Sequence, residues 1–147
     1  MATADSPALR HRTLRCVVVT PERAVLDEAA DFVAVPMYDG ELGVEPGRLP
    51  LIGRLGYGEL RLRRGGEVRR YFIDGGFAQV RANTVTVLTP RAQRAEDIDP
   101  AAAAQALEAA QAPAPNPRAQ EAHLKAQERA RAQLRVARHA TAGGGHA

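Results

Sequence analysis

The chain has 147 residues, which suits one ordinary domain or one small domain with an appendage. It contains three tyrosines, three phenylalanines and no tryptophan, so its core must be mainly aliphatic. The single cysteine, Cys16, excludes an internal disulfide and a cysteine-based metal cluster. Residues 1–117 carry 14 basic and 15 acidic side chains, whereas residues 118–147 carry 6 basic and 2 acidic ones. The net charge of +3 therefore belongs to the C-terminal segment, and the near-neutral remainder argues against a general nucleic-acid-binding platform.

The N-terminal sequence MATADSPALRHRT lacks the apolar run of a secretory signal, and no stretch approaches the roughly 18 apolar residues of a membrane span. We therefore expect a soluble, cytoplasmic chain whose tails, residues 1–13 and 141–147, are disordered. Cys16 lies in the apolar run LRCVVVT and is interpreted as a buried, unreactive thiol. Four histidines lack a partner at ligand spacing and are interpreted as surface residues rather than metal ligands: His11, His123, His139 and His146.

Residues 14–90 predict a domain of short β-strands. Residues 14–20 are rich in β-branched side chains, and residues 30–37 alternate with the period of two that is typical of a strand. Two hairpins follow, with turns at residues 64–67 and at residues 82–83. Many short strands with turns between them, and no long helical pattern, indicate a β-sandwich or a barrel.

The segment DGELGVEPGRLPLIG, residues 39–53, is rich in glycine and proline but keeps several aliphatic side chains. A mobile linker would be polar throughout, and a strand would not tolerate so many breakers. We therefore interpret it as a rigid loop that its apolar side chains anchor to the β domain. Gly75 and Gly76 are interpreted as a sharp corner between strands, because the lysine and the helix of a phosphate-binding loop are missing.

Beyond the strands, the sequence predicts two helices. Residues 91–111 form the first, which is rich in alanine, with Asp99 suited to the N-cap and Pro100 to the first helical position. The proline-rich segment 112–117 ends it, and the second helix is expected from about residue 118 to residue 140. Two helices joined by a short loop most simply form a hairpin.

We expect this hairpin to dock only weakly on the β domain. Along its second helix runs a stripe of mostly alanine side chains: Ala119, Ala122, Ala126, Ala130, Leu134 and Ala137. Burying one methyl group contributes about 0.8 kcal/mol, which is less than the roughly 1.5–3 kcal/mol of a buried leucine. Weak docking is a disadvantage in a purely structural element, but a switch requires it.

Three stretches together resemble the epsilon subunit of the F-type ATP synthase, of the bacterial type: DGELGVEPGRLPLIG at residues 39–53, YFIDGGFAQVRANTVTVLTPRAQRAEDID at residues 71–99 and KAQERARAQLRVA at residues 125–137. The resemblance implies an α+β fold, in which an antiparallel β-sandwich of about ten short strands (residues 14–90) precedes a regulatory helical hairpin (residues 91–140). It implies a non-catalytic rotor subunit, without a cofactor, that couples proton translocation through the ring of c subunits to ATP synthesis. Such a subunit is held at the cytoplasmic face of the cell inner membrane by its partner subunits alone.

The resemblance also implies two partner surfaces. The loop over residues 39–48 is expected to face the c-ring through five residues: Asp39, Glu41, Leu42, Val44 and Arg48. The family usually has histidine at the position of Arg48 and alanine at that of Leu49, so the chemistry of this contact differs here. The strand after the glycine corner is expected to contact the gamma subunit through Phe77, Gln79 and Arg81.

Some bacterial members bind ATP between the two helices, and part of their motif is present. Five positions retain residues of that site: Arg94, Ile98, Asp99, Ala103 and Arg129. Ala102 and Gln133 stand where arginines are expected, and Gln93 stands where a glutamate is expected. Because the lost guanidinium groups remove most of the charge-assisted hydrogen bonds to a triphosphate, we expect weak or absent ATP binding.

The second helix carries five clustered basic side chains: Lys125, Arg129, Arg131, Arg135 and Arg138. The resemblance implies that this helix can leave the sandwich, extend along gamma and transiently contact an acidic segment of the catalytic beta subunits, which would inhibit ATP hydrolysis. The plainer interpretation is a solvated surface helix. The alternative function is a nucleic-acid-binding module, although no aromatic residue follows Phe77 to stack on bases. A free-standing ATP sensor is a third hypothesis, and it depends on the missing arginines.

The sequence contains no pairing of a nucleophile with a base. Glu96, Asp97 and Asp99 sit at a helix start, where the macrodipole favours negative charge, and that position explains them without an acid–base role. We therefore expect no catalytic activity from the chain itself.

Overall fold

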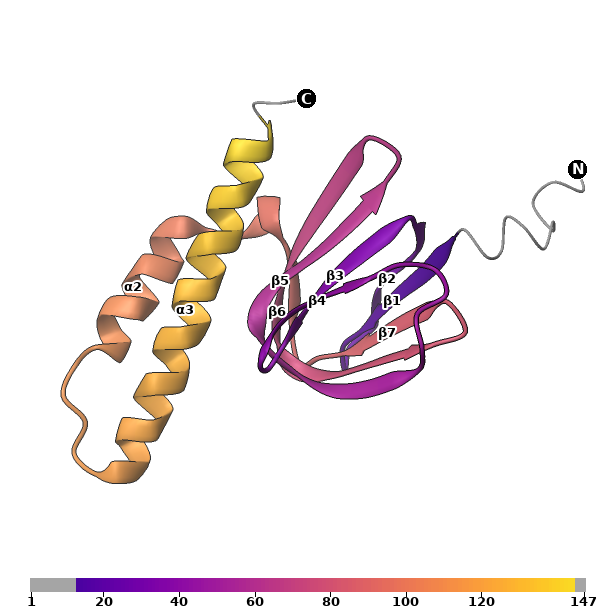
Figure 1. Ribbon diagram of the computed structural model, residues 1–147. Helices are drawn as coiled ribbons and strands as arrows, with labels where there is room; N and C mark the ends of the chain where they lie inside the picture. The colour runs from indigo at the N-terminus through magenta and orange to yellow at the C-terminus, as the bar shows by residue number, and fades with distance from the viewer. Residues whose placement is uncertain (1–12, 145–147) are drawn as a thin grey trace, which may run out of the picture.

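The structure of the protein, a computed structural model, describes residues 13–144. Eight strands are followed by a short 3-10 helix and two α-helices (Figure 1). The strands are β1 (Leu14–Val19), β2 (Ala24–Ala30), β3 (Phe32–Met37), β4 (Gly40–Val44), β5 (Leu51–Arg64), β6 (Glu67–Arg81), β7 (Thr84–Leu88) and β8 (Ala92–Arg94). The helices are η2 (Ala95–Asp97), α2 (Pro100–Ala110) and α3 (Pro117–Gly144). The disorder expected at residues 1–12 and 145–147 concerns residues outside the described part, whereas residues 141–144 are helical and continue α3 beyond its predicted end.

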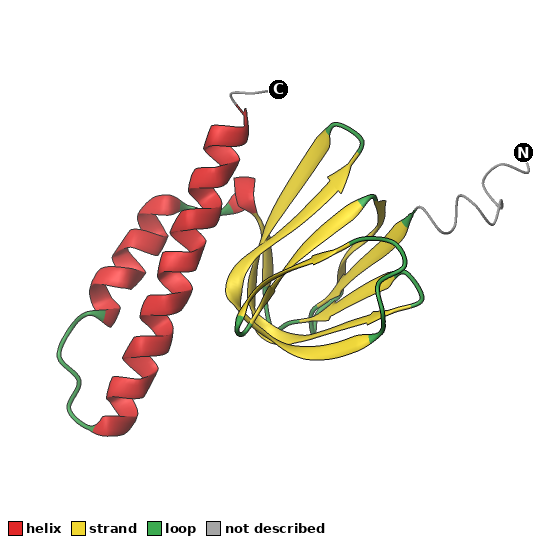
Figure 2. Ribbon diagram, in the orientation of Figure 1, coloured by secondary structure: helices red, strands yellow, loops and turns green. Residues whose placement is uncertain are grey.

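The strands form one hydrogen-bonded sheet in the order β2-β1-β7-β6-β5-β3-β4, and β8 pairs with β6 outside that order. The sheet folds over on itself into two layers, with the helices on one side (Figure 2). The layers enclose a core of mainly valine, leucine and isoleucine side chains from β1 to β7. Cys16 is fully buried in this core, as predicted, and this burial raises the pKa of its thiol to about 12. The predicted α+β fold, a β-sandwich followed by two helices, is confirmed.

Two details of the predicted sandwich are wrong. We expected about ten short strands, but the described residues contain eight, because β5 and β6 are 14 and 15 residues long. Gly75 and Gly76 have φ values of 74° and 105°, so β6 bends there without ending, and the predicted corner lies inside one strand. We also expected only antiparallel pairing, but β1 and β7 are parallel. Alternation within single strands carries no information about the direction of their neighbours.

A strand also occurs where the sequence predicted a loop. β4 lies within residues 39–53 and pairs with β3 over its whole length, in spite of its glycines. Gly43 leaves room for a neighbour, because a Cβ at this position would lie 3.0 Å from the ring of Phe32, which would have to shift slightly. The turn that follows β4 is tied down by a hydrogen bond of 2.8 Å from the Gly47 amide to the side chain of Asn83. Pairing with β3 and this hydrogen bond restrain the backbone of the segment, whose predicted rigidity stays a prediction.

The first predicted helix is shorter than expected. Residues 92–94 form β8 and pair with β6, so that α2 begins only at Pro100. Asp99 is the N-cap, as predicted, and its side chain accepts a hydrogen bond of 3.0 Å from the Ala101 amide. β2, with the sequence AVLDEAA, was not predicted at all, because alanine and acidic residues are uncommon in strands.

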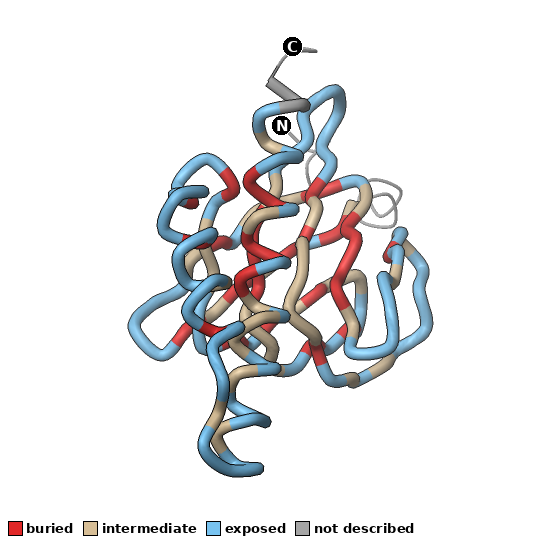
Figure 3. The backbone as a smooth tube through the Cα atoms, turned by 90° about the vertical axis from the view of Figure 1, so that its left-hand side faces the viewer, coloured by how far each residue is buried: buried red, intermediate tan, exposed pale blue. Residues whose placement is uncertain are grey.

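The hairpin of α2 and α3 packs on the sandwich through β5, β6 and η2 (Figure 1). A second, small core lies at this junction: Phe72, Ala95, Ile98, Ala132, Val136 and Ala137. The stripe predicted on α3 describes this packing poorly, because Ala122 is exposed and the stripe omits Ala132 and Val136. The reason is that α3 contacts α2 and the sandwich at once. The loop end of the hairpin is mostly exposed (Figure 3).

Candidate functional site

The junction between the hairpin and the sandwich combines its small core with three polar contacts. In the first, Arg129 of α3 donates from Nε to Oδ1 of Asp74 in β6 at 2.7 Å. The guanidinium also lies 5.2 Å from the centroid of the Tyr57 ring. The hydrogen bond to Asp74 is the main cause that raises the pKa of Arg129. Arg129, expected as an ATP ligand or a contact to beta, is thus already engaged within the chain.

The second contact joins Gln133 of α3 to Gln93 of β8, with Nε2 donating to Oε1 at 3.0 Å. These are two of the positions at which the charged residues of the ATP-binding motif are replaced. The structure brings them together as a neutral pair that is satisfied without a ligand. Arg129 and Gln133, two of the α3 positions at which a triphosphate would be held, are therefore engaged with residues of β6 and β8.

The other residues of the ATP motif have structural roles as well. Ile98 and Ala103 are buried, and Ile98 belongs to the small core at the junction. Asp99 caps α2, and Arg94 pairs with Glu96 at 2.9 Å. These contacts support the prediction of weak or absent ATP binding, which stays a prediction.

The third contact was not predicted. Nδ1 of His139, near the end of α3, lies 2.7 Å from Oε2 of Glu59 in β5. The Glu59 side chain is only 10% exposed and also pairs with Arg70 at 2.9 Å and with Arg61 at 3.6 Å. The prediction that His139 is a surface residue agrees with its exposure, but it did not include this partner. The two residues are 80 positions apart, so no local pattern could indicate the pair.

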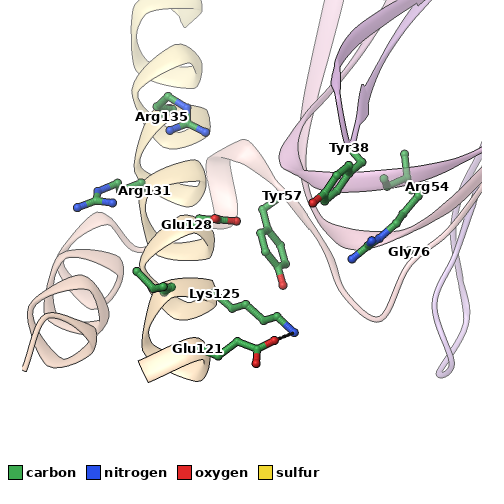
Figure 4. Close-up of a pocket in the computed structure, with 11 residues that line it drawn as sticks. Tyr38, Arg54, Tyr57, Gly76, Glu121, Lys125, Glu128, Arg131 and Arg135 are labelled. Atoms are coloured by element: carbon green, nitrogen blue, oxygen red, sulfur yellow. Dashed lines mark ion pairs between the residues drawn. The ribbon is translucent and has the colours of Figure 1, made fainter. Parts of the chain in front are cut away.

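A groove runs between α3 and the sandwich (Figure 4). Tyr57 projects into it from β5, and Arg54 lies 4.5 Å from the centroid of the Tyr38 ring on its sheet side. On the helix side, Lys125 pairs with Glu121 at 3.6 Å, and Arg131 and Arg135 contribute to the lining. Of the five predicted regulatory cations, Arg138 is exposed on the helix and Arg129 is engaged with Asp74. The basic cluster is thus spread over several sides of α3.

The residues expected to face the c-ring divide into two groups. Asp39, Glu41 and Arg48 are exposed, and Glu41 pairs with Arg61 at 3.2 Å. Val44 is fully buried, which does not fit the expected outward contact, whereas Leu42 is only partly buried where it packs against the main core. For Val44 the prediction is wrong because side chains alternate along β4. Leu49, 80% exposed, supplies an apolar side chain at this surface instead.

The expected gamma-contact residues lie on one exposed surface of the sheet. Phe77 is 58% exposed and is paired with Leu88 of β7, which is 53% exposed. Gln79 is exposed beside Ile52 of β5, which is 76% exposed. Arg81 follows on the same side of β6. We call Ile52, Phe77, Gln79, Arg81 and Leu88 the outer sheet surface. Sequence reasoning missed Ile52 and Leu88, which only the strand register brings beside Phe77.

Within residues 13–144, no helix is long and apolar enough to cross a membrane. The same residues contain no group of three histidine, cysteine or carboxylate side chains that could hold a metal ion.

Comparisons with known proteins agree with this architecture. The beta-sandwich domain of the ATP synthase delta/epsilon chain matches residues 13–95. The ATP synthase epsilon chain of Rhodopirellula baltica is 54% identical over 127 residues, which cover 86% of this chain and 99% of that relative. The epsilon chain of Solibacter usitatus is 46% identical over 105 residues, 71% of this chain and 78% of the relative. In the mitochondrial ATP synthase of Euglena gracilis, a solved complex of OSCP, F1 and the c-ring, one chain superposes with a TM-score of 0.75 at 27% identity, covering 82% of this chain and 78% of that one.

The sandwich, its docked hairpin and these similarities define a non-catalytic subunit of a larger rotary assembly. The chain belongs to the delta/epsilon family of ATP synthase central-stalk subunits, as its resemblance indicated. Its partners are therefore other subunits of ATP synthase, and family membership favours this function over the nucleic-acid-binding alternative.

Proposed function

We propose that the sandwich joins the gamma subunit to the c-ring. Proton translocation through the ring would then drive rotation of gamma within the catalytic head. The outer sheet surface supports the gamma contact, because exposed Ile52, Phe77 and Leu88 lie beside each other there. Clustered exposed apolar side chains of this kind are typical of protein interfaces. The exposed polar residues Asp39, Glu41 and Arg48 would face the c-ring, the first two from the start of β4 and Arg48 from the turn beyond its end.

The hairpin is the regulatory part of this proposal. The regulatory role of the hairpin rests on the composition of the junction core. Among the described buried residues of this core, only Phe72, Ile98 and Val136 are large, and the rest are alanines. Release of α3 would expose these three large side chains and a few methyl groups, so contacts made in the released state have to offset the cost. Once released, the basic side chains of α3 would reach an acidic segment of the beta subunits and restrain ATP hydrolysis.

The same proposal places the chain at the cytoplasmic face of the cell inner membrane, as a peripheral subunit. It would be attached through the c-ring and gamma rather than through lipid. The similarity to epsilon chains of bacterial ATP synthases supports this position.

ATP hydrolysis by the assembled catalytic head tests the proposal. We expect hydrolysis to be several-fold faster with a chain that ends at Ile98 than with the full chain, because the basic helix can no longer reach beta. In the full chain, Arg131→Glu combined with Arg135→Glu should also make ATP hydrolysis faster. Both side chains are exposed, and reversal of their charge would repel the acidic segment of beta. Arg118→Glu, at the opposite end of α3, is the control and should leave the rate unchanged.

Co-purification with gamma must show that each variant is still bound. Unchanged hydrolysis with the truncated subunit bound would contradict the restraining role of the hairpin. It would leave the coupling role of the sandwich in place.

A further inference from the structure

The connection between β4 and β5, residues 45–50, contains a tight turn. The Arg48 amide donates to the Glu45 carbonyl at 3.2 Å, which closes the turn. Its two middle residues are Pro46 and Gly47, and the φ of Gly47 is 88°. Proline followed by a residue of positive φ is typical of a type II turn. In such a turn the amide of the third residue, here Gly47, has no acceptor within the turn, so it needs a partner elsewhere or water.

The partner of this amide is Asn83, in the two-residue turn between β6 and β7. Gly47 donates to Oδ1 of Asn83 at 2.8 Å, across 36 positions of the sequence. The carbonyl oxygen of Asn83 accepts a second hydrogen bond of 2.8 Å, from the Arg15 amide in β1. Asn83 is thus attached to β1 by its backbone and to the turn by its side chain. Because residues 45–50 are exposed apart from the partly buried Pro46, packing contributes little to holding this turn.

The local conformation of Asn83 does not explain why asparagine stands there. Ala82 and Asn83 have φ values of 49° and 60°, as in the hairpin turn that requires positive φ at both central residues. Glycine is the preferred residue at the second of these positions and adopts such a φ without strain. Glycine has no side-chain acceptor, however, so the feature that asparagine adds is the hydrogen bond to Gly47.

We propose that Asn83 is a positioning residue, which holds the turn at residues 45–48 so that Arg48 and Leu49 are oriented toward the c-ring. Arg48 ends the turn and is exposed, and Leu49 follows it with 80% of its surface exposed. A segment that is already oriented loses less conformational freedom on binding, which strengthens binding without a new contact. This inference rests on the c-ring contact assumed in the proposed function.

Three variants of the β6–β7 turn test the positioning. Asn83→Gly keeps the backbone conformation and removes the acceptor, whereas Asn83→Asp keeps an acceptor oxygen and also tolerates positive φ. Ala82→Gly is the matched control, because it changes the neighbouring residue and leaves the hydrogen bond in place. In the isolated full-length chain, NMR should show hydrogen exchange of the Gly47 amide about fivefold faster in Asn83→Gly and close to native in the other two variants. Equal exchange in all four chains would overturn the inference.

Binding to the c-ring tests the purpose of the positioning. The purified complex of each variant with gamma is bound to immobilised c-ring in detergent, and gamma alone gives the baseline. We expect Asn83→Gly to weaken binding about threefold, and Asn83→Asp and Ala82→Gly to bind as the native chain does. Native affinity of Asn83→Gly would overturn the inference, and so would binding by Asn83→Asp that is as weak as that of Asn83→Gly. Failure of the native complex to bind better than gamma alone would instead contradict the proposed function.

Discussion

Gly76 shows how a single residue determines the path of β6. Its φ of 105° is strained for any other residue, and a Cβ there would lie 2.0 Å from the carbonyl oxygen of Leu88. We expect Gly76→Ala to lower the free energy of unfolding by about 3 kcal/mol, because both the strain and the backbone clash must be relieved. Urea denaturation measures this. Gly66→Ala is the control, since its turn is open, and should change stability by less than about 0.5 kcal/mol. Equal stability of the two variants would contradict the role of Gly76 in the path of β6.

At the scale of elements, the sequence predicted those strands whose side chains alternate or are β-branched, such as β1 and β3. It failed for β2 and β4, whose alanine, acidic and glycine residues are favoured in strands only by the pairing that tertiary structure supplies. The same limit applies to the junction. Helix propensity and the Asp99 cap predicted α2, but the contact of Arg129 with Asp74 joins residues 55 positions apart. Such pairs depend on how the elements pack and leave no local pattern.

The docking of α3 as an element depends on that contact. We expect Arg129→Gln to shift the docking equilibrium about fivefold toward release, because it leaves Asp74 at 13% exposure without its cation, while partial exposure of Arg129 limits the effect. Energy transfer between fluorophores on cysteines introduced by Gly66→Cys, in the open turn between β5 and β6, and Gln120→Cys, on exposed α3, measures it. Asp74→Asn should have a similar effect, and the double variant should add little. Arg138→Gln, on the exposed side of α3, is the control. Full additivity of the two variants would show that the residues act independently.

At the scale of the whole molecule, the hairpin and the outer sheet surface occupy separate parts of the sandwich. One face carries the hairpin, through the junction core and its polar contacts, and the outer sheet surface is left uncovered by the described residues. If the proposed function holds, the chain would remain attached through the outer sheet surface while the hairpin docks or is released. This separation requires that attachment and regulation respond to different substitutions.

Substitution of the outer sheet surface tests that requirement. We expect Phe77→Asp to weaken binding to the gamma subunit by more than about tenfold, because a charge replaces a partly exposed apolar side chain at the centre of the proposed contact. Val68→Asp is the matched control: Val68 is 45% exposed, but it lies near the β5–β6 turn, away from this surface. Surface plasmon resonance with immobilised gamma gives both affinities, and the energy-transfer assay should show unchanged docking of the hairpin in both variants. If Phe77→Asp binds gamma as tightly as Val68→Asp does, the gamma contact lies elsewhere on the sandwich.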